Sequence, residues 1–137
     1  TSLTPAEELK LLLRPAGGGL YLVSTGRAEQ QALQRRYYGA ASDEDVTQAF
    51  HAMLDRIPGA RVVVLGVPSD VGAGFRRGAN LGPQAIREQL VADEPDWAST
   101  SLARGIVDIG DVFVVPQLLE DEMLAPEQLA RSRRATR

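Results

Sequence analysis

The residues best suited to bind a ligand lie in a glycine-rich segment, residues 66–87, with the sequence GVPSDVGAGFRRGANLGPQAIR. Asp70 can accept hydrogen bonds or pair with a cation, and Arg76 can receive a carboxylate or pair with Asp70. A plain connection between a strand and a helix needs only a few residues. The length and the glycine content of this segment therefore predict a shaped loop that contributes to a binding site.

Phosphate-binding patterns do not account for the loop. A P-loop requires a lysine that reaches the phosphates, and the only lysine of the chain is Lys10, far upstream. A dinucleotide fingerprint requires a third glycine for close contact between helix and strand, and Arg77 stands at that position. The sequence therefore disfavours nucleotide binding.

The elements around the loop predict an α/β fold. Residues 61–67 (RVVVLGV) are continuously apolar and β-branched, which is typical of a parallel strand covered on both faces. Pro83 favours the first turn of a helix, and residues 105–111 (GIVDIGD) form a second strand candidate. The order strand, loop, helix, strand predicts a parallel sheet, whose ligands bind beyond the carboxyl ends of its strands.

Residues 1–60 are predicted to form a mostly helical N-terminal extension, and residues 61–137 the first part of the α/β domain. The extension could cover one face of the sheet or mediate oligomer contacts. Thr4, Pro5 and Glu7 predict a capped helix start, and Ser42 predicts another. The remaining segments are interpreted as a short strand or extended segment (20–25), a helix ended by Gly39 (27–38), a loop (92–100) and two helices (116–124 and 126–137).

Composition excludes several classes of function. The chain has 15 basic and 18 acidic residues, a net charge of −3 and no cysteine. Disulfides, thiolate metal sites and cysteine nucleophiles are therefore excluded, and the charge predicts neither a nucleic acid nor a membrane as a partner. No apolar run approaches the roughly 20 residues of a membrane span. A cytoplasmic location is the default expectation.

Several motifs in fixed order resemble the N-terminal signature of the ureohydrolases, the family of arginase, agmatinase and formimidoylglutamase. They are Gly66-x-Pro68-x-Asp70-x-Gly72, Arg76-x-Gly78-Ala79, Gly82-Pro83-x-x-Ile86-Arg87 and the strand Val107–Val112 (VDIGDV), so that the resemblance covers about residues 61–112. Agmatinase-like members tend to have proline at position 77 and arginine at position 80. Here these positions hold Arg77 and Asn80, so no substrate is assigned.

The resemblance implies a three-layer αβα fold with a mainly parallel sheet, two Mn²⁺ ions and a small guanidino or formimino substrate. It also implies a homo-oligomer. In such an enzyme a metal-bridged hydroxide attacks the substrate carbon, and urea or formamide leaves. The family's later ligand motifs, G-G-D-H, D-A-H-x-D and S-x-D-x-D-x-x-D-P, are absent from this sequence, and the only histidine, His51, is expected to be a structural helix residue.

The chain is therefore predicted to be the N-terminal part of a binuclear manganese hydrolase, inactive alone. The remainder of the same polypeptide would supply the metal ligands and the catalytic groups. The alternative is a non-catalytic ureohydrolase-like protein that binds or regulates a partner.

No catalytic residue and no metal ligand is assigned within the chain. Four loop residues are predicted to border the substrate: Asp70, Gly72, Arg76 and Asn80. Seven are predicted to shape the loop and the start of the helix: Gly66, Pro68, Gly74, Gly78, Gly82, Pro83 and Arg87. Asp70 could contact the substrate or a metal-bound water, or form a salt bridge with Arg76 or Arg87. Glycines 72, 74, 78 and 82 are expected to serve backbone conformations with φ > 0. Arg87 is expected to tie the helix to the loop, Asp111 to order the loop after its strand, and Asp108 to pair within the fold.

Overall fold

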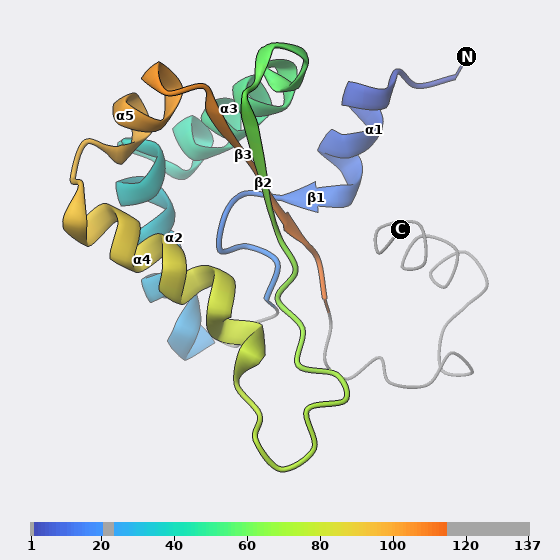
Figure 1. The fold of residues 1–137 in the computed structure, drawn as a ribbon, viewed down its shortest axis with the longest axis vertical. Helices are drawn as coiled ribbons and strands as arrows, with labels where there is room; N and C mark the ends of the chain where they lie inside the picture. Colours follow the sequence, from blue (N-terminus) through green and yellow to red (C-terminus); the bar gives the residue numbers. More distant parts are fainter. Residues whose placement is uncertain (1, 21–23, 115–137) are drawn as a thin grey trace.

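The computed structural model describes residues 2–20 and 24–114. Its helices and strands, in chain order, are α1 (Pro5–Leu12), β1 (Leu13–Arg14), α2 (Ser24–Tyr38), α3 (Asp43–Asp55), β2 (Val62–Gly66), α4 (Gly82–Asp93), α5 (Trp97–Ala103) and β3 (Ile106–Val112). Short 3-10 turns lie at Ile57–Gly59 and Ala79–Leu81. Figure 1 shows the strands side by side and α2, α3, α4 and α5 grouped together. Helix α1 leads into β1 and contacts α3.

The sheet has the strand order β1-β3-β2. β2 pairs with β3 in parallel, from Val62 opposite Ile106 to Gly66 opposite Asp111, with an irregularity between Val64 and Gly66. This pairing confirms the predicted parallel unit of strand, loop, helix and strand. The two-residue strand β1 was not predicted, and it pairs with β3 in the antiparallel direction. The described sheet is therefore small and mixed.

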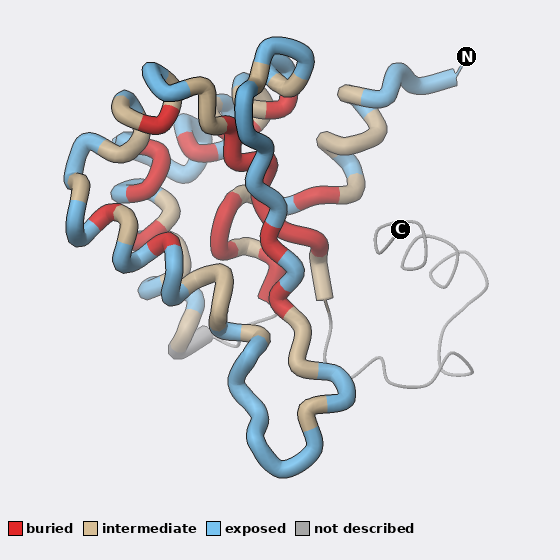
Figure 2. Tube along the Cα trace, in the orientation of Figure 1, coloured by how far each residue is buried: buried red, intermediate tan, exposed pale blue. Residues whose placement is uncertain are grey.

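The hydrophobic core lies between β3 and the N-terminal half of the chain. Its buried members come from these two parts and, for Val91, from α4: Leu13, Ala16, Tyr37, Tyr38, Val46, Phe50, Leu54, Val91, Val107, Ile109 and Val112. Strand β3 is buried along almost its whole length, whereas the four apolar residues of β2 are exposed (Figure 2). The prediction that the first strand is covered on both faces is thus wrong for the described residues, because β2 packs mainly against its neighbour β3 and its side chains remain exposed on both faces.

Local signals in the sequence predicted most helix ends. Thr4 and Glu7 form the predicted capping box at the start of α1. The Ser42 side chain accepts a hydrogen bond from the Asp45 amide at the start of α3. Gly39 follows α2 with φ of +63°, the left-handed conformation that glycine adopts at little cost. These contacts satisfy backbone groups that a helix terminus leaves without partners.

Two predicted segments differ from the structure. Ser24 and Thr25 belong to α2 instead of a strand, and Leu20 forms a single parallel bridge to Val114. Residues 97–100 of the predicted loop belong to α5, because Trp97 packs against the core. Residues 21–23 of the predicted strand and the helices predicted at 116–137 lie outside the described residues. None of the helices described here has the length and apolar character to cross a membrane.

Candidate functional site

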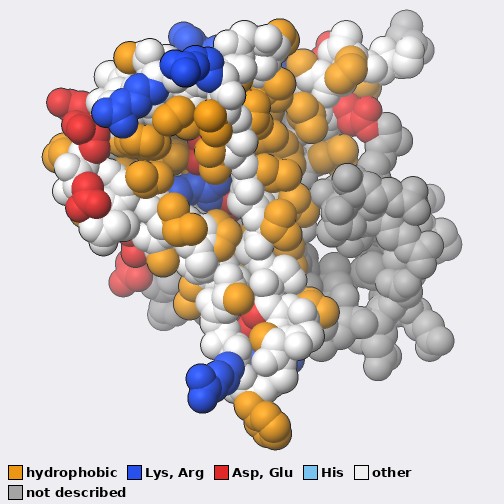
Figure 3. All heavy atoms as spheres, viewed as in Figure 1, with side chains coloured by type: hydrophobic (Ala, Val, Ile, Leu, Met, Phe, Trp, Pro, Cys, Tyr) orange, Lys and Arg blue, Asp and Glu red, His pale blue; other side chains and the backbone are white. Residues whose placement is uncertain are grey.

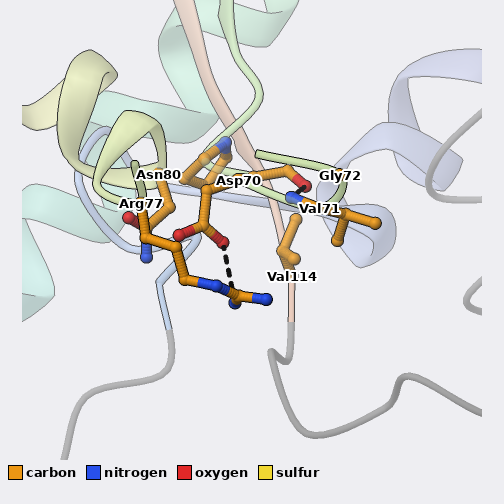
Figure 4. Close-up of a pocket in the computed structure, with 8 residues that line it drawn as sticks. Asp70, Val71, Gly72, Arg77, Asn80 and Val114 are labelled. Carbon is orange, nitrogen blue, oxygen red and sulfur yellow. Dashed lines mark hydrogen bonds and ion pairs between the residues drawn. The ribbon is translucent and has the colours of Figure 1, made fainter. Parts of the chain in front are cut away.

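A small pocket of about 60 Å³ lies beyond the carboxyl ends of the two parallel strands. Its walls come from the loop after β2 and from the residue two positions beyond β3: Pro68, Ser69, Asp70, Val71, Gly72, Arg77, Asn80 and Val114 (Figure 4). Open α/β sheets bind their ligands at this end of the strands. The pocket is therefore the candidate site.

Asp70 is the acidic side chain of this pocket, and its side chain is only 14% exposed. Oδ2 accepts a hydrogen bond from the Gly78 amide at 3.3 Å, and Oδ1 lies 3.9 Å from Nη1 of Arg77. The predicted salt bridge to Arg76 or Arg87 is wrong, since the partner is Arg77. The Arg77 side chain is 64% exposed, so water screens this long ion pair and little energy opposes its separation.

The other residues predicted to border the substrate divide into two groups. Gly72 and Asn80 line the pocket with Asp70, whereas Arg76 is exposed and is not among the lining residues. Arg77, which the sequence did not single out as a binding residue, takes the place in the pocket expected for Arg76. The pattern Arg-Arg at 76–77 offered two candidates, and only the backbone path of the loop decides which one faces Asp70.

Three of the loop glycines adopt the conformations predicted for them. Gly72, Gly74 and Gly78 have φ of +85°, +63° and +126°, a region that other residues rarely adopt. Nothing lies within 4 Å of a Cβ built on any of the three, so conformation, and not crowding, favours glycine. Gly82 differs, with an ordinary helical φ of −56° at the start of α4, so its predicted need for φ > 0 is wrong. Pro83 stands in the first turn of α4, as predicted.

Gly66 and Pro68 fix the start of the loop by packing. Pro68 is among the most completely buried side chains, and Gly66 is also buried. A Cβ on Gly66 would collide with the carboxylate of Asp111 and would lie 3.1 Å from Nη2 of Arg87. Close contact with this carboxylate therefore requires glycine at position 66.

Behind the pocket, Arg87 forms the centre of a buried charge cluster. It is 3% exposed and donates two hydrogen bonds to Asp108, from Nε to Oδ2 and from Nη2 to Oδ1, each of 3.0 Å. Nη1 also donates to Oδ1 of Asp111, and Nη2 donates to the Gly110 carbonyl at 3.2 Å. Arg87 thus ties α4 to β3, and not to the loop as predicted. Burial alone would lower the pKa of Arg87, but the two carboxylates outweigh it and raise the pKa above its usual value.

Asp111 connects this cluster to the N-terminal half of the chain. Oδ2 of Asp111 accepts hydrogen bonds from the amides of Gly17 and Gly19, at 3.0 and 3.2 Å. Asp111 therefore orders the segment before α2, and the expectation that it orders the loop after its own strand is wrong. Asp108 pairs within the fold, as predicted.

Tyr37 extends the cluster into α2 and α5. Its hydroxyl donates to Oδ2 of Asp108 at 2.6 Å and accepts a hydrogen bond from Nε1 of Trp97 at 3.2 Å. Burial and the negative charge of Asp108 raise the pKa of Tyr37. The phenol therefore keeps its proton, and its role as a hydrogen-bond donor, to a higher pH than an ordinary tyrosine.

The described residues do not fit a binuclear manganese site. No group of three His, Cys, Asp or Glu side chains suited to a metal ion lies within ranges 2–20 and 24–114. The two aspartates of β3, Asp108 and Asp111, already share the guanidinium of Arg87. His51 is half-buried on α3 beside Phe50, which agrees with its predicted structural role.

The sequence offered only a partial signal for this cluster. Two aspartates inside an otherwise apolar strand indicate buried charges that require a cation. Nothing in the sequence pointed to Tyr37 or to the amides of Gly17 and Gly19, which belong to a segment far from β3 along the chain. These hydrogen-bond partners of Asp108 and Asp111 come close to β3 only through the packing of the folded chain.

A parallel βαβ unit with a shaped loop and a pocket at its carboxyl end defines an α/β ligand-binding architecture. The model of the arginase family matches residues 60–136, more than half of the chain. The chain belongs to the arginase family, and the recognised motifs fall within the matched range. No curated protein and no solved structure matches the chain.

Proposed function

We propose that this chain is the N-terminal part of a binuclear manganese-dependent hydrolase of a guanidino or formimino compound. The observation that carries the proposal is the position of the pocket, where the signature loop and the end of β3 meet beyond the carboxyl ends of two parallel strands. The arginase-family match supports it independently. A three-layer αβα fold and a homo-oligomer are parts of the same proposal.

The pocket has chemistry suited to such a substrate. The carboxylate of Asp70 can pair with a guanidinium or amidinium group, and its present partner Arg77 is held loosely. Arg77 and the amide of Asn80 offer donors to an anionic or carbonyl group at the other end of the same molecule. These residues would bind and orient the substrate, and none of them is placed to break a bond.

The metal ions and the catalytic groups of the proposed enzyme must come from residues other than those described. The carboxylates of β3 are engaged by Arg87, and the pocket holds a single acidic side chain. We therefore propose that this chain forms one wall of the active site, and we expect the 137-residue chain to be inactive alone.

The test is to express the complete reading frame and to assay release of urea or formamide with and without Mn²⁺. The substrates to compare are arginine, agmatine, guanidinobutyrate and formimidoylglutamate, and the 137-residue chain serves as the matched control. We expect manganese-dependent release from at least one substrate by the complete product and none by the control. Release by the 137-residue chain alone would refute the assignment of the catalytic groups to other residues.

The second candidate is a non-catalytic, ureohydrolase-like binding or regulatory protein. The lack of a metal-ligating group among the described residues favours it. If the complete product is folded and releases neither urea nor formamide from any of the four substrates, this candidate replaces the first.

A further inference from the structure

The loop after β2 has its buried anchor at its start. Of residues 66–82, only Gly66 and Pro68 are buried. The rest of the loop projects beyond the helices and the sheet (Figure 1, Figure 3), and Phe75 near its tip is fully exposed. Pro68 also lines the candidate pocket. The position of the loop wall therefore depends on what packs against Pro68.

Gly19 packs against this anchor from the N-terminal part of the chain. A Cβ built on Gly19 would lie 2.8 Å from Cγ of Pro68. It would also meet the carbonyl oxygen of Val112 and, at 2.5 Å, the Cβ of Asp111. Gly19 is not among the glycines with positive φ. Close packing, and not backbone conformation, therefore requires glycine at position 19.

The same residue holds the other side of the pocket, at the end of β3. The amide of Val114 donates a hydrogen bond to the carbonyl oxygen of Gly19 at 2.9 Å, and the neighbouring Leu20 forms a parallel bridge to Val114. Val114 lines the pocket together with the loop (Figure 4). The amide of Gly19 also donates to Oδ2 of Asp111, which fixes its position on β3. Two walls of the pocket, Pro68 and Val114, thus rest on one glycine.

We propose that Gly19 is a positioning residue of the candidate site, which sets the distance between Pro68 on the loop and Val114 after β3. This inference rests on the proposed function, since it gives the N-terminal segment a part in substrate binding. Gly19 does not line the pocket and acts through its two neighbours. It also precedes residues 60–136, which the arginase-family model matches, so the family match does not predict this role.

The size of the expected effect follows from how steeply binding and rate depend on geometry. A misplacement of about 1 Å in a group that positions the substrate can cost on the order of 100-fold in rate. A methyl group at position 19 must displace Pro68, the backbone of Val112 or the Gly19 segment itself, because none of these contacts is the far end of a flexible side chain. Each of these displacements changes the separation of the two walls.

The experiment compares Gly19→Ala with Gly18→Ala in the product of the complete reading frame. A Cβ on Gly18 would be crowded as well, but against the carbonyl oxygen of Pro15 at 2.9 Å and Nε2 of Gln34 at 3.1 Å, away from the pocket. Both substitutions should therefore lower the melting temperature. The loop is proposed to bind and orient the substrate, so only Gly19→Ala should raise KM, by about tenfold, with kcat nearly constant. Equal changes in KM for the two variants would overturn the proposal.

A second readout does not depend on activity. Ser69 lines the pocket and is half-buried, and the 137-residue sequence contains no cysteine. Ser69→Cys therefore places a reporter thiol in the loop wall. Its rate of labelling by iodoacetamide can be followed by mass spectrometry of the peptide that contains residue 69. Adding Gly19→Ala should raise this rate by about threefold or more, because the displaced wall opens more often, whereas adding Gly18→Ala should leave it unchanged. The same rate in all three proteins would contradict the proposed role.

A milder variant serves if Gly19→Ala does not fold. A Cβ on Gly17 has its nearest listed neighbour at 3.9 Å, but φ of +83° strains an alanine at this position. Gly17→Ala therefore disturbs the same segment without severe crowding, and it should raise KM and the labelling rate less than Gly19→Ala. If neither quantity changes, the segment does not position the pocket.

The outcome is separable from that of the proposed function. If Gly19→Ala raises the labelling rate and no variant, the parent protein included, releases urea or formamide, the positioning role stands and the hydrolase is refuted. If the parent releases urea or formamide and Gly19→Ala changes neither KM nor the labelling rate, the hydrolase stands and the positioning role is refuted.

Discussion

The Arg87 cluster and the loop after β2 both contain residues of the family signature, yet they differ in burial and in the number of hydrogen-bond partners. Arg87, Asp108 and Asp111 are almost inaccessible to water, and several donors satisfy each carboxylate. In the loop, Asp70 has one amide donor and a distant, exposed arginine. The cluster joins the α/β unit to the N-terminal half, whereas β2 packs mainly against β3 and its apolar side chains are exposed.

This difference shows that a family signature can contain charged residues for two reasons, folding and ligand binding. A buried and fully paired charge is expensive to disturb, and its role is to hold elements together. A charge with a weak partner is available to a ligand at little cost. The signature residue Arg87 therefore holds the fold together, whereas the role proposed for the signature residue Asp70 is in binding.

The largest expected effect comes from Arg87→Met, which keeps the approximate length of the side chain and removes its charge. Two buried carboxylates would lose their cation, and breaking a buried pair in this way costs about 3–5 kcal/mol. Urea unfolding followed by circular dichroism should show this loss as a lower midpoint. Since a small domain has only about 5–15 kcal/mol of stability, the variant could fail to fold, and Arg87→Lys then provides an intermediate case.

The control for Arg87→Met is Arg77→Met in the loop. The Arg77 side chain is 64% exposed, so the loss of its ion pair with Asp70 should cost at most about 1 kcal/mol. Equal destabilisation by the two substitutions would show that Arg87 and Arg77 contribute alike to stability, and would contradict the difference inferred between cluster and loop.

Gly66→Ala should have the next largest effect, because Gly66 lies where the loop meets the cluster. The added methyl group would meet the carboxylate of Asp111, which Arg87 and two backbone amides hold in place. Overpacking of this kind costs about 1–3 kcal/mol. The measurement is again the free energy of unfolding.

Gly59→Ala is the matched substitution. Nothing lies within 4 Å of a Cβ at Gly59, and its φ lies outside the left-handed region. Its expected effect lies between zero and a gain of about 1 kcal/mol, from reduced freedom of the unfolded chain. If Gly66→Ala is tolerated as well as Gly59→Ala, the contact between Gly66 and Asp111 is not the constraint inferred here.

Local signals explain what the sequence predicted. The helix starts at Thr4 and Ser42, the end of α2 at Gly39, and the parallel pairing of β2 with β3 follow from capping, glycine conformation and apolar runs. The helix starts and the helix end depend on residues close together in the chain, whereas the parallel pairing follows from the order strand, loop, helix, strand. The positive φ values of three loop glycines belong to the same group.

Long-range pairing explains what the sequence did not predict. The apolar run of β2 is compatible with a covered strand, but its exposure depends on which elements pack over its two faces. Asp111 contacts Gly17 and Gly19 across more than 90 residues of chain. The choice of Arg77 over Arg76 as the partner of Asp70 depends on the path of the loop. Neither the periodicity nor the spacing of residues in the sequence predicts these contacts.

The smallest expected effect on stability belongs to Asp70→Asn. The substitution removes the ion pair with Arg77 but retains an oxygen that can accept from the Gly78 amide, so the cost should not exceed about 1 kcal/mol. Asp111→Asn is the matched change in the cluster, where one amide oxygen cannot serve Arg87 and both backbone donors. It should cost several times more.

Asp70→Asn also distinguishes a binding role from a structural one. In the complete product, loss of a charge-assisted hydrogen bond to a cationic substrate should lower kcat/KM about tenfold to a hundredfold, while the melting temperature stays nearly constant. The two measurements, made on the same preparation, separate binding from folding. A fall in melting temperature comparable with that of Asp111→Asn, without a separate loss of activity, would place Asp70 with the structural cluster and leave the pocket without its ligand-binding carboxylate.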